Sequence, residues 1–136
     1  MATFTWDAAT MSTGVPEIDL QHQTLIGKVN ELLDAMRQGR AESQVAPILD
    51  FLTRYTVKHF SHEEQCMARA ACPAAAANKA AHAQFLTTVK RLRAQYEQSG
   101  ATTAVILGVQ RELGDWLRNH IIRTDTQLRT CTVSAA

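Results

Sequence analysis

Apolar residues recur every three or four positions in four successive blocks of the chain, and alternating β-branched residues are scarce. This spacing is typical of amphipathic α-helices that turn one face toward a core. It predicts helices over about 18–37, 47–70, 75–98 and 103–125. The short connections between these blocks favour antiparallel neighbours, so we expect an all-α protein folded as an up-down-up-down four-helix bundle.

Glycine and proline residues mark the boundaries of the predicted helices. Gly39 follows the first block, and Pro47 opens the second, since proline is tolerated in a first helical turn. Pro73 and Gly100 separate the remaining blocks. Before the first block we expect an irregular N-terminal arm over 1–17, anchored by Trp6, with the bundle over 18–128 and one domain over 1–136.

Composition narrows the class of protein. A chain of 136 residues with 46% hydrophobic and 20% charged residues suits a single globular domain. Fourteen basic and thirteen acidic residues are mixed along the chain, which argues against nucleic acid as a partner. The sequence has no apolar run that predicts a membrane span and no signal-peptide pattern.

The three cysteines are Cys66, Cys72 and Cys131, and no two of them have CxxC spacing. An odd number without this spacing indicates neither a disulfide framework nor a thiolate zinc site. We therefore expect reduced thiols and a cytoplasmic location. Nothing in the sequence indicates the oligomeric state.

Four of the five histidines lie on the predicted inward faces, one in each helix. In an antiparallel bundle, the starts of the first and third helices lie at the same end as the ends of the second and fourth. These are the places of His22, His59, His82 and His120. A lone inward histidine is usually an ordinary core residue, but four imidazoles converging on one layer predict a functional site.

Two carboxylates accompany the histidines. Glu63 lies one turn after His59 on the same face, and Asp125 follows His120 by five residues. A buried carboxylate needs a cation, and no Lys or Arg is expected on the inward faces, so a metal is the remaining candidate. Four imidazoles and two carboxylates exceed the needs of one tetrahedral zinc and suit iron or another divalent transition metal. Two metals bridged by the carboxylates would satisfy this set.

The spacing of His120 and Asp125 requires a departure from regular helix. Five residues turn an α-helix by about 500°, which leaves two side chains about 140° apart. A π-type bulge or a frayed helix end would bring them together. His62 and Glu64 fall outside the inward stripe of the second helix, and we expect both to face solvent.

With these features the chain resembles the bacterial hemerythrins over about residues 6–128. The resemblance is carried by Trp6, Gly14-Val15, Ile18-Asp19, Gln21-His22, the string from His59 to Glu64 with Met67, Pro73, His82, Phe85, Trp116-Leu117, His120-Ile121 and Asp125. It implies a non-haem di-iron centre, with two Fe bridged by hydroxide or oxide, that binds O2 reversibly. It also implies one iron on His22 and His59 and another on His82 and His120, with Glu63 and Asp125 bridging. Our candidates for an apolar O2 pocket are Leu25, Ile26, Met67, Trp116, Leu117 and Ile121.

Asn78 departs from the family pattern, which has a histidine four residues before the position of His82. An amide oxygen is a weaker and harder ligand than imidazole. The second iron would therefore have a weak Asn78 ligand, a bound water or a vacant position. We expect an oxygen carrier, store or delivery protein, with O2 as ligand and a protein acceptor of O2 as a potential partner, and not an enzyme beyond weak oxidase or peroxidase side activity. The alternatives are a di-iron enzyme acting on peroxide or nitric oxide, an oxygen sensor, and a metal-free interaction bundle.

Overall fold

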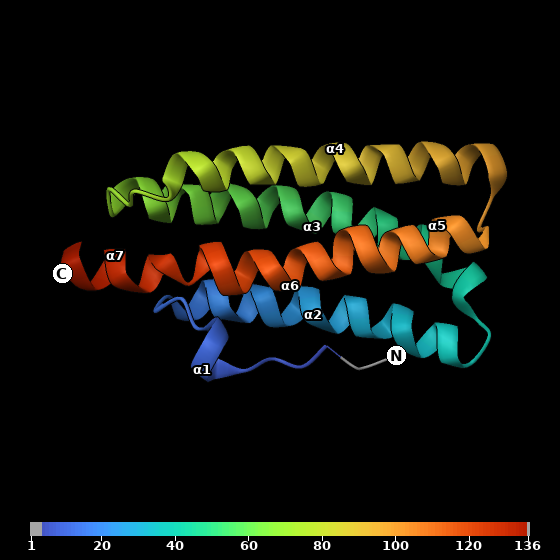
Figure 1. Cartoon of the computed structure of the whole chain (residues 1–136), viewed down its shortest axis with the longest axis horizontal. Helices are drawn as coiled ribbons and strands as arrows, with labels where there is room; N and C mark the ends of the chain where they lie inside the picture. Colours follow the sequence, from blue (N-terminus) through green and yellow to red (C-terminus); the bar gives the residue numbers. More distant parts are fainter. Residues whose placement is uncertain (1–3, 136) are drawn as a thin grey trace.

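The computed structural model describes residues 4–135, which form a bundle of four long antiparallel helical segments (Figure 1). Consecutive segments pack side by side, and the fourth closes against the first. The segments are α2 (Pro16–Arg37), α3 (Ala41–Arg69), α4 (Ala75–Ser99) and a fourth that comprises α5 (Thr103–Gly108), η1 (Val109–Asp115), α6 (Trp116–His120) and η2 (Ile121–Asp125). The predicted all-α four-helix bundle is confirmed, and the described residues contain no strand.

Several helix bounds differ from the prediction. The helix expected to start at Pro47 starts six residues earlier, so Pro47 lies inside α3. A proline there removes one backbone hydrogen bond, but Ala41 and Val45 are buried and extend the apolar face toward the N-terminus. The fourth segment was expected to be one helix with a π-type bulge or a frayed end before Asp125. It contains the π-helical turn η2 there and a second one, η1, that was not expected. It is followed by α7 (Gln127–Ala135).

The N-terminal arm is only partly irregular. It contains the short helix α1 (Ala8–Met11), and α2 starts at Pro16. The Phe4 amide donates to Asn30 Oδ1 at 2.9 Å, and Asn30 Nδ2 donates to the Phe4 carbonyl at 2.6 Å. Trp6 is only partly buried against the core, so Phe4 and Asn30 share the anchoring that we expected of Trp6. Residues 1–3 of the expected arm lie outside the described residues.

Two glycines let the fourth segment approach its neighbours closely. A Cβ at Gly108 would lie 2.7 Å from a methyl group of Leu92 on α4, and one at Gly114 would lie 3.2 Å from Val29 on α2. At these distances a Cβ would crowd the neighbouring side chain, because the core is already closely packed. The absence of a side chain at these positions therefore fits the fourth segment against both neighbouring helices.

The buried apolar residues form two clusters. The larger fills most of the bundle and includes Leu25, Phe60, Phe85, Leu117 and Ile121. The smaller lies around the α3–α4 connection and consists of Ile18, Met67, Cys72, Ala74, Leu128 and Cys131, with partly buried neighbours. In each of the four segments, the predicted site residues lie between a residue of the larger cluster and a residue of the smaller one. Apolar side chains therefore close the site at both ends.

The cysteine prediction is wrong for two of the three residues. Cys72 in the α3–α4 connection and Cys131 in α7 form a disulfide, while Cys66 is free. The two partners are 59 residues apart in sequence, so no local spacing indicated the pair. The expected cytoplasmic location rested partly on three reduced thiols, and the disulfide removes that part of its support. Among the described residues, no helix is long and apolar enough to cross a membrane.

Candidate metal centre

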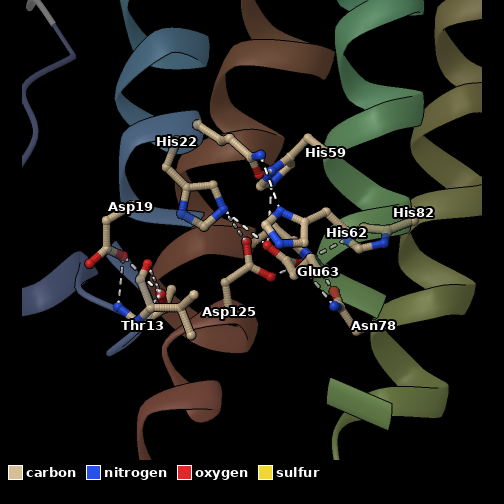
Figure 2. Close-up of polar contacts among 12 residues, drawn as sticks. Thr13, Asp19, His22, His59, His62, Glu63, Asn78, His82 and Asp125 are labelled. Carbon is tan, nitrogen blue, oxygen red and sulfur yellow. Dashed lines mark hydrogen bonds and ion pairs between the residues drawn. The ribbon is translucent and has the colours of Figure 1, made fainter. Parts of the chain in front are cut away.

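The structure brings all seven predicted ligand residues into one buried layer of the bundle. His22 comes from α2, His59 and Glu63 from α3, and Asn78 and His82 from α4, and most of them appear together in Figure 2. The last turns of α6 and η2 supply His120 and Asp125. Each of the seven side chains belongs to a buried residue. Antiparallel topology thus produces the convergence that the sequence predicts.

The acidic and histidine ligand atoms divide into two groups that share their carboxylates. One group is formed by His22, His59, Glu63 and Asp125, and the other by Glu63, His82, His120 and Asp125. Within each group the candidate atoms lie within 4.8 Å of one another. We call these groups the His59 half and the His82 half of the site. Each half offers two imidazoles, and both halves use the same two carboxylates.

The two oxygens of Glu63 face opposite halves. Glu63 Oε2 lies 3.1 Å from His22 Nε2 and 3.3 Å from His59 Nε2. Glu63 Oε1 lies 3.1 Å from His82 Nε2. A carboxylate with one oxygen toward each of two ligand groups has the arrangement of a bridge between two metals.

Asp125 has the same divided geometry. Its Oδ2 lies 3.0 Å from His22 Nε2, and its Oδ1 lies 3.2 Å from His120 Nε2. The π-helical turn η2 explains how His120 and Asp125 meet, because the Thr126 amide donates to the Ile121 carbonyl five residues earlier at 3.2 Å. This wider turn brings side chains five residues apart onto one face. It is one of the two solutions that the sequence allowed.

Three side-chain atoms of the layer are buried without a hydrogen-bond partner, namely His22 Nδ1, His82 Nε2 and Asp125 Oδ1. The last two lie at ion-pair distance from neighbouring groups of the site, but their geometry makes no hydrogen bond. Buried polar atoms are usually satisfied. His82 Nε2 and Asp125 Oδ1 face other groups of the site, and unsatisfied atoms with lone pairs there fit ligands for a metal ion.

The electrostatics show how the metal-free chain holds two buried carboxylates. Burial lowers the pKa of His22, but contacts with Asp125 and Glu63 outweigh it and raise that pKa to about 9. The pKa of His82 is also raised, against burial, by Glu63 and Glu64. Burial would raise the pKa of Glu63, yet the close contacts with His22, His59 and His82 hold it well below its usual range. Without a metal, protons on His22 and His82 therefore supply the positive charge.

Asn78 lies inside the His82 half. The protonated Nε2 of His120 donates to Asn78 Oδ1 at 2.6 Å, and Asn78 Nδ2 donates to Glu63 Oε1 at 2.9 Å and to Met67 Sδ at 3.3 Å. The amide oxygen therefore lies next to a ligand nitrogen of this half. Its side chain lies between His120 and Glu63.

His62 and Glu64 were expected to face solvent, and both are only partly exposed because each also contacts an adjoining helix. Adjacent helical residues point about 100° apart, so the neighbours of the inward Glu63 lie at the flanks of α3, against adjoining helices. His62 Nδ1 accepts from Gln21 Nε2 of α2 at 3.2 Å. Glu64 Oε2 accepts from His82 Nδ1 of α4 at 3.0 Å. Both side chains are 28% exposed.

Gln21 is a site residue that the reasoning from periodicity missed. Its Oε1 accepts a hydrogen bond from His59 Nδ1 at 2.7 Å. The signal was its position directly before His22, where it turns toward α3 while His22 turns inward. Gln21 and Glu64 thus hold the outer nitrogens of His59 and His82, which leaves Nε2 of each ring toward the centre.

The expected pocket residues surround this layer. Leu25, Ile26, Met67, Leu117 and Ile121 are buried, and Trp116 is partly buried. Trp116 stacks on His120 with ring centroids 4.4 Å apart, and Phe60 stacks on His82 at 3.8 Å. Leu117 also lines a small enclosed apolar cavity of about 10 Å³. The His82 half therefore has aromatic walls.

Fold and site together define a helical-bundle protein with two groups of candidate metal ligands that share two carboxylates. Comparison with known proteins agrees with this class. The model of the hemerythrin HHE cation-binding domain matches residues 13–130. The bacteriohemerythrin of Methylococcus capsulatus is 34% identical over 131 residues, which cover 96% of this chain and 98% of that protein. The bacteriohemerythrin of Stenotrophomonas maltophilia is 33% identical over 135 residues, with 99% and 84% covered.

Solved structures give the same answer. A wild-type hemerythrin crystal structure matches with a TM-score of 0.74 at 30% identity, and covers 96% of this chain and 98% of the other. A point mutant of a hemerythrin matches with a TM-score of 0.79 at 32% identity and the same coverage. The chain belongs to the hemerythrin family, whose members are non-haem iron proteins that bind O2.

Proposed function

We propose that this chain binds O2 reversibly at a non-haem di-iron centre and serves as an oxygen carrier, store or delivery protein. The observation that supports this most is the pair of ligand groups that share Glu63 and Asp125. In the proposed centre, His22 and His59 would hold one iron, and His82 and His120 would hold the other. Glu63 and Asp125 would be shared between the two irons, together with a hydroxide or oxide.

When bound, the irons would donate electrons to O2 and take them back when O2 is released. The chain's own contribution is to fix the ligands and to keep water out. Its ligand layer lies between two apolar clusters, and the pocket candidates Leu25, Ile26, Met67, Trp116, Leu117 and Ile121 belong to these clusters or pack on them. A dry apolar pocket would discourage the loss of oxygen as an anion. An anion that leaves the irons would have to cross surroundings that solvate charge poorly.

Asn78 supports a second candidate, a di-iron enzyme acting on peroxide or nitric oxide. An amide is a weaker ligand for iron than imidazole. If Asn78 leaves a position open on the second iron, both metals become accessible to small molecules. The remaining alternatives are an oxygen sensor and a metal-free interaction bundle.

Cycles of oxygenation separate these functions. The protein is loaded with Fe²⁺ without air, exposed to O2 and then returned to an O2-free atmosphere, while its absorption spectrum is followed. A carrier or store regains its original spectrum over repeated cycles. Sustained turnover of added peroxide or nitric oxide would favour the enzyme, and failure to retain iron would favour the interaction bundle.

A further inference from the structure

The halves of the site differ in the group that holds the outer nitrogen of one histidine. His59 Nδ1 donates to the neutral amide oxygen of Gln21 at 2.7 Å, whereas His82 Nδ1 donates to the carboxylate of Glu64 at 3.0 Å. Since both acceptors lack a proton to donate, each ring carries its hydrogen on Nδ1. Each ring therefore presents Nε2 to the centre, but only His82 does so with a negative charge behind it.

His82 is held on three sides. Glu64 binds its outer nitrogen, Phe60 stacks on its face with an interplanar angle of 3°, and Glu63 lies 3.1 Å from its inner nitrogen. The side chain of His82 is 2% exposed, whereas that of Glu64 is 28% exposed. Glu64 therefore lies partly in solvent while its hydrogen bond reaches a buried ring.

A carboxylate behind a metal-bound imidazole fixes the ring and increases the basicity of the ligand nitrogen. We propose that Glu64 is a positioning residue that strengthens His82 as a metal ligand in the half of the site where Asn78 stands. The proposal rests on the dinuclear centre proposed above. It makes the two halves unequal through an outer partner, although each half has two imidazoles and the same carboxylates.

Two substitutions separate the charge of Glu64 from its position. In Glu64→Gln the side chain keeps its shape and an oxygen that accepts from His82 Nδ1, so only the charge is lost. In Glu64→Ala both the charge and the hydrogen bond are lost. Glu97→Gln removes the same charge from an exposed position of α4 and serves as the control.

The experiment is an anaerobic titration of each protein with Fe²⁺ in competition with a coloured chelator, together with thermal unfolding of the metal-free forms. Wild type and Glu97→Gln are each expected to bind two Fe²⁺, and the two affinities in Glu97→Gln should match those in wild type. In Glu64→Gln one of the two equivalents should weaken by about tenfold, and in Glu64→Ala by up to about 100-fold, the range found for outer partners of metal ligands. The other equivalent should keep its affinity, and metal-free unfolding of Glu64→Gln should match wild type.

A mirror substitution strengthens the test. Gln21→Glu places a carboxylate behind His59 and should tighten the equivalent that Glu64→Gln leaves unchanged. Unchanged affinities in both Glu64 variants would overturn the proposal, as would equal weakening of both equivalents accompanied by a less stable metal-free protein. A wild type that binds fewer than two Fe²⁺ would contradict the dinuclear centre itself, and this result is visible before any variant is measured.

Discussion

The two halves of the site share their carboxylates but lie in different surroundings. In the His59 half, His22 and His59 meet edge to face at a centroid distance of 4.7 Å, and the outer partner is an amide. In the His82 half, both imidazoles stack on aromatic rings, and the outer partner of His82 is a carboxylate. The two halves thus have the same number of imidazoles and share the same carboxylates, but the electrostatic environments of their imidazoles differ.

The largest loss of iron binding is expected from a change at Glu63, because both halves of the site share this residue. Glu63→Gln removes the negative charge that would bridge two cations, so iron should be lost from both halves. The loss of affinity should exceed the about 10–100-fold that outer partners contribute. Iron analysis after gel filtration checks this, with Glu97→Gln as the control. If Glu63→Gln retained two irons with an unchanged spectrum, Glu63 would not be a bridge.

The metal-free form of the same variant tests the ion pairs within the site. Glu63 is fully buried and lies 3.1 Å from His22, whose pKa it helps to raise. Removal of one partner of a buried ion pair is destabilising, so denaturant unfolding of the metal-free proteins should show a lower free energy of unfolding for Glu63→Gln. An unchanged free energy of unfolding would mean that Glu63 serves only the metal.

Asn78→His sharpens the comparison because it changes only the His82 half. An added imidazole should raise iron retention there and lengthen the lifetime of the oxygenated form. We expect retention to improve by at least the about tenfold that an outer partner typically contributes. The measurement is the decay of the oxygenated absorption after anaerobic reduction and exposure to air. Equal lifetimes and equal iron retention would place Asn78 outside the ligand set.

The disulfide should affect both halves alike. It ties α7, which closely follows η2, to the α3–α4 connection, and Asp125 at the end of η2 faces both halves. The double variant Cys72→Ser with Cys131→Ser should lower the free energy of unfolding by about 2–4 kcal/mol. Its two Fe²⁺ affinities should keep the ratio found in wild type. A change in only one affinity would show that α7 acts on one half selectively.

The last prediction concerns the free energy of unfolding of the metal-free chain and its dependence on pH. His22 has a pKa of about 9 in the folded state against 6.5 as its ordinary value. A raised pKa stabilises the folded state fully below pH 6.5, and this contribution is lost as the pH rises toward 9. The raised pKa of His82 acts in the same direction. The free energy of unfolding of the metal-free protein should therefore fall between pH 6.5 and 9, by about 3 kcal/mol for His22.

Metal-loaded protein provides the control for this effect. A metal ligand is deprotonated at every pH at which the metal stays bound. The loaded protein should therefore show no matching decline in denaturant unfolding between pH 6.5 and 9. A parallel decline in both forms would mean that His22 and His82 are not the groups responsible.

The sequence predicted the bundle and the buried layer because both depend on helical periodicity and antiparallel order. One inward histidine per helix was enough to place His22, His59, His82 and His120 together. The need for an irregular turn before Asp125 also followed from helix geometry. These features depend on which way each residue points along its own helix.

The features that were missed depend on which helices are neighbours and how far they are rotated. His62 and Glu64 lie outside the inward stripe, and periodicity alone cannot distinguish a flank that meets another helix from one that meets solvent. The extension of α3 before Pro47 was missed because the local penalty of proline was offset by burial of Ala41 and Val45. The Cys72–Cys131 pair depends on where α7 lies, which no spacing in the sequence indicates.

The number of irons per chain tests the central claim most directly. Protein loaded with excess Fe²⁺ under anaerobic conditions and freed of unbound metal is analysed for iron and protein concentration, and its spectrum is recorded before and after exposure to O2. The dinuclear account predicts two irons per chain and an absorption that appears with O2 and disappears when O2 is removed. One iron or fewer per chain at full loading would contradict it.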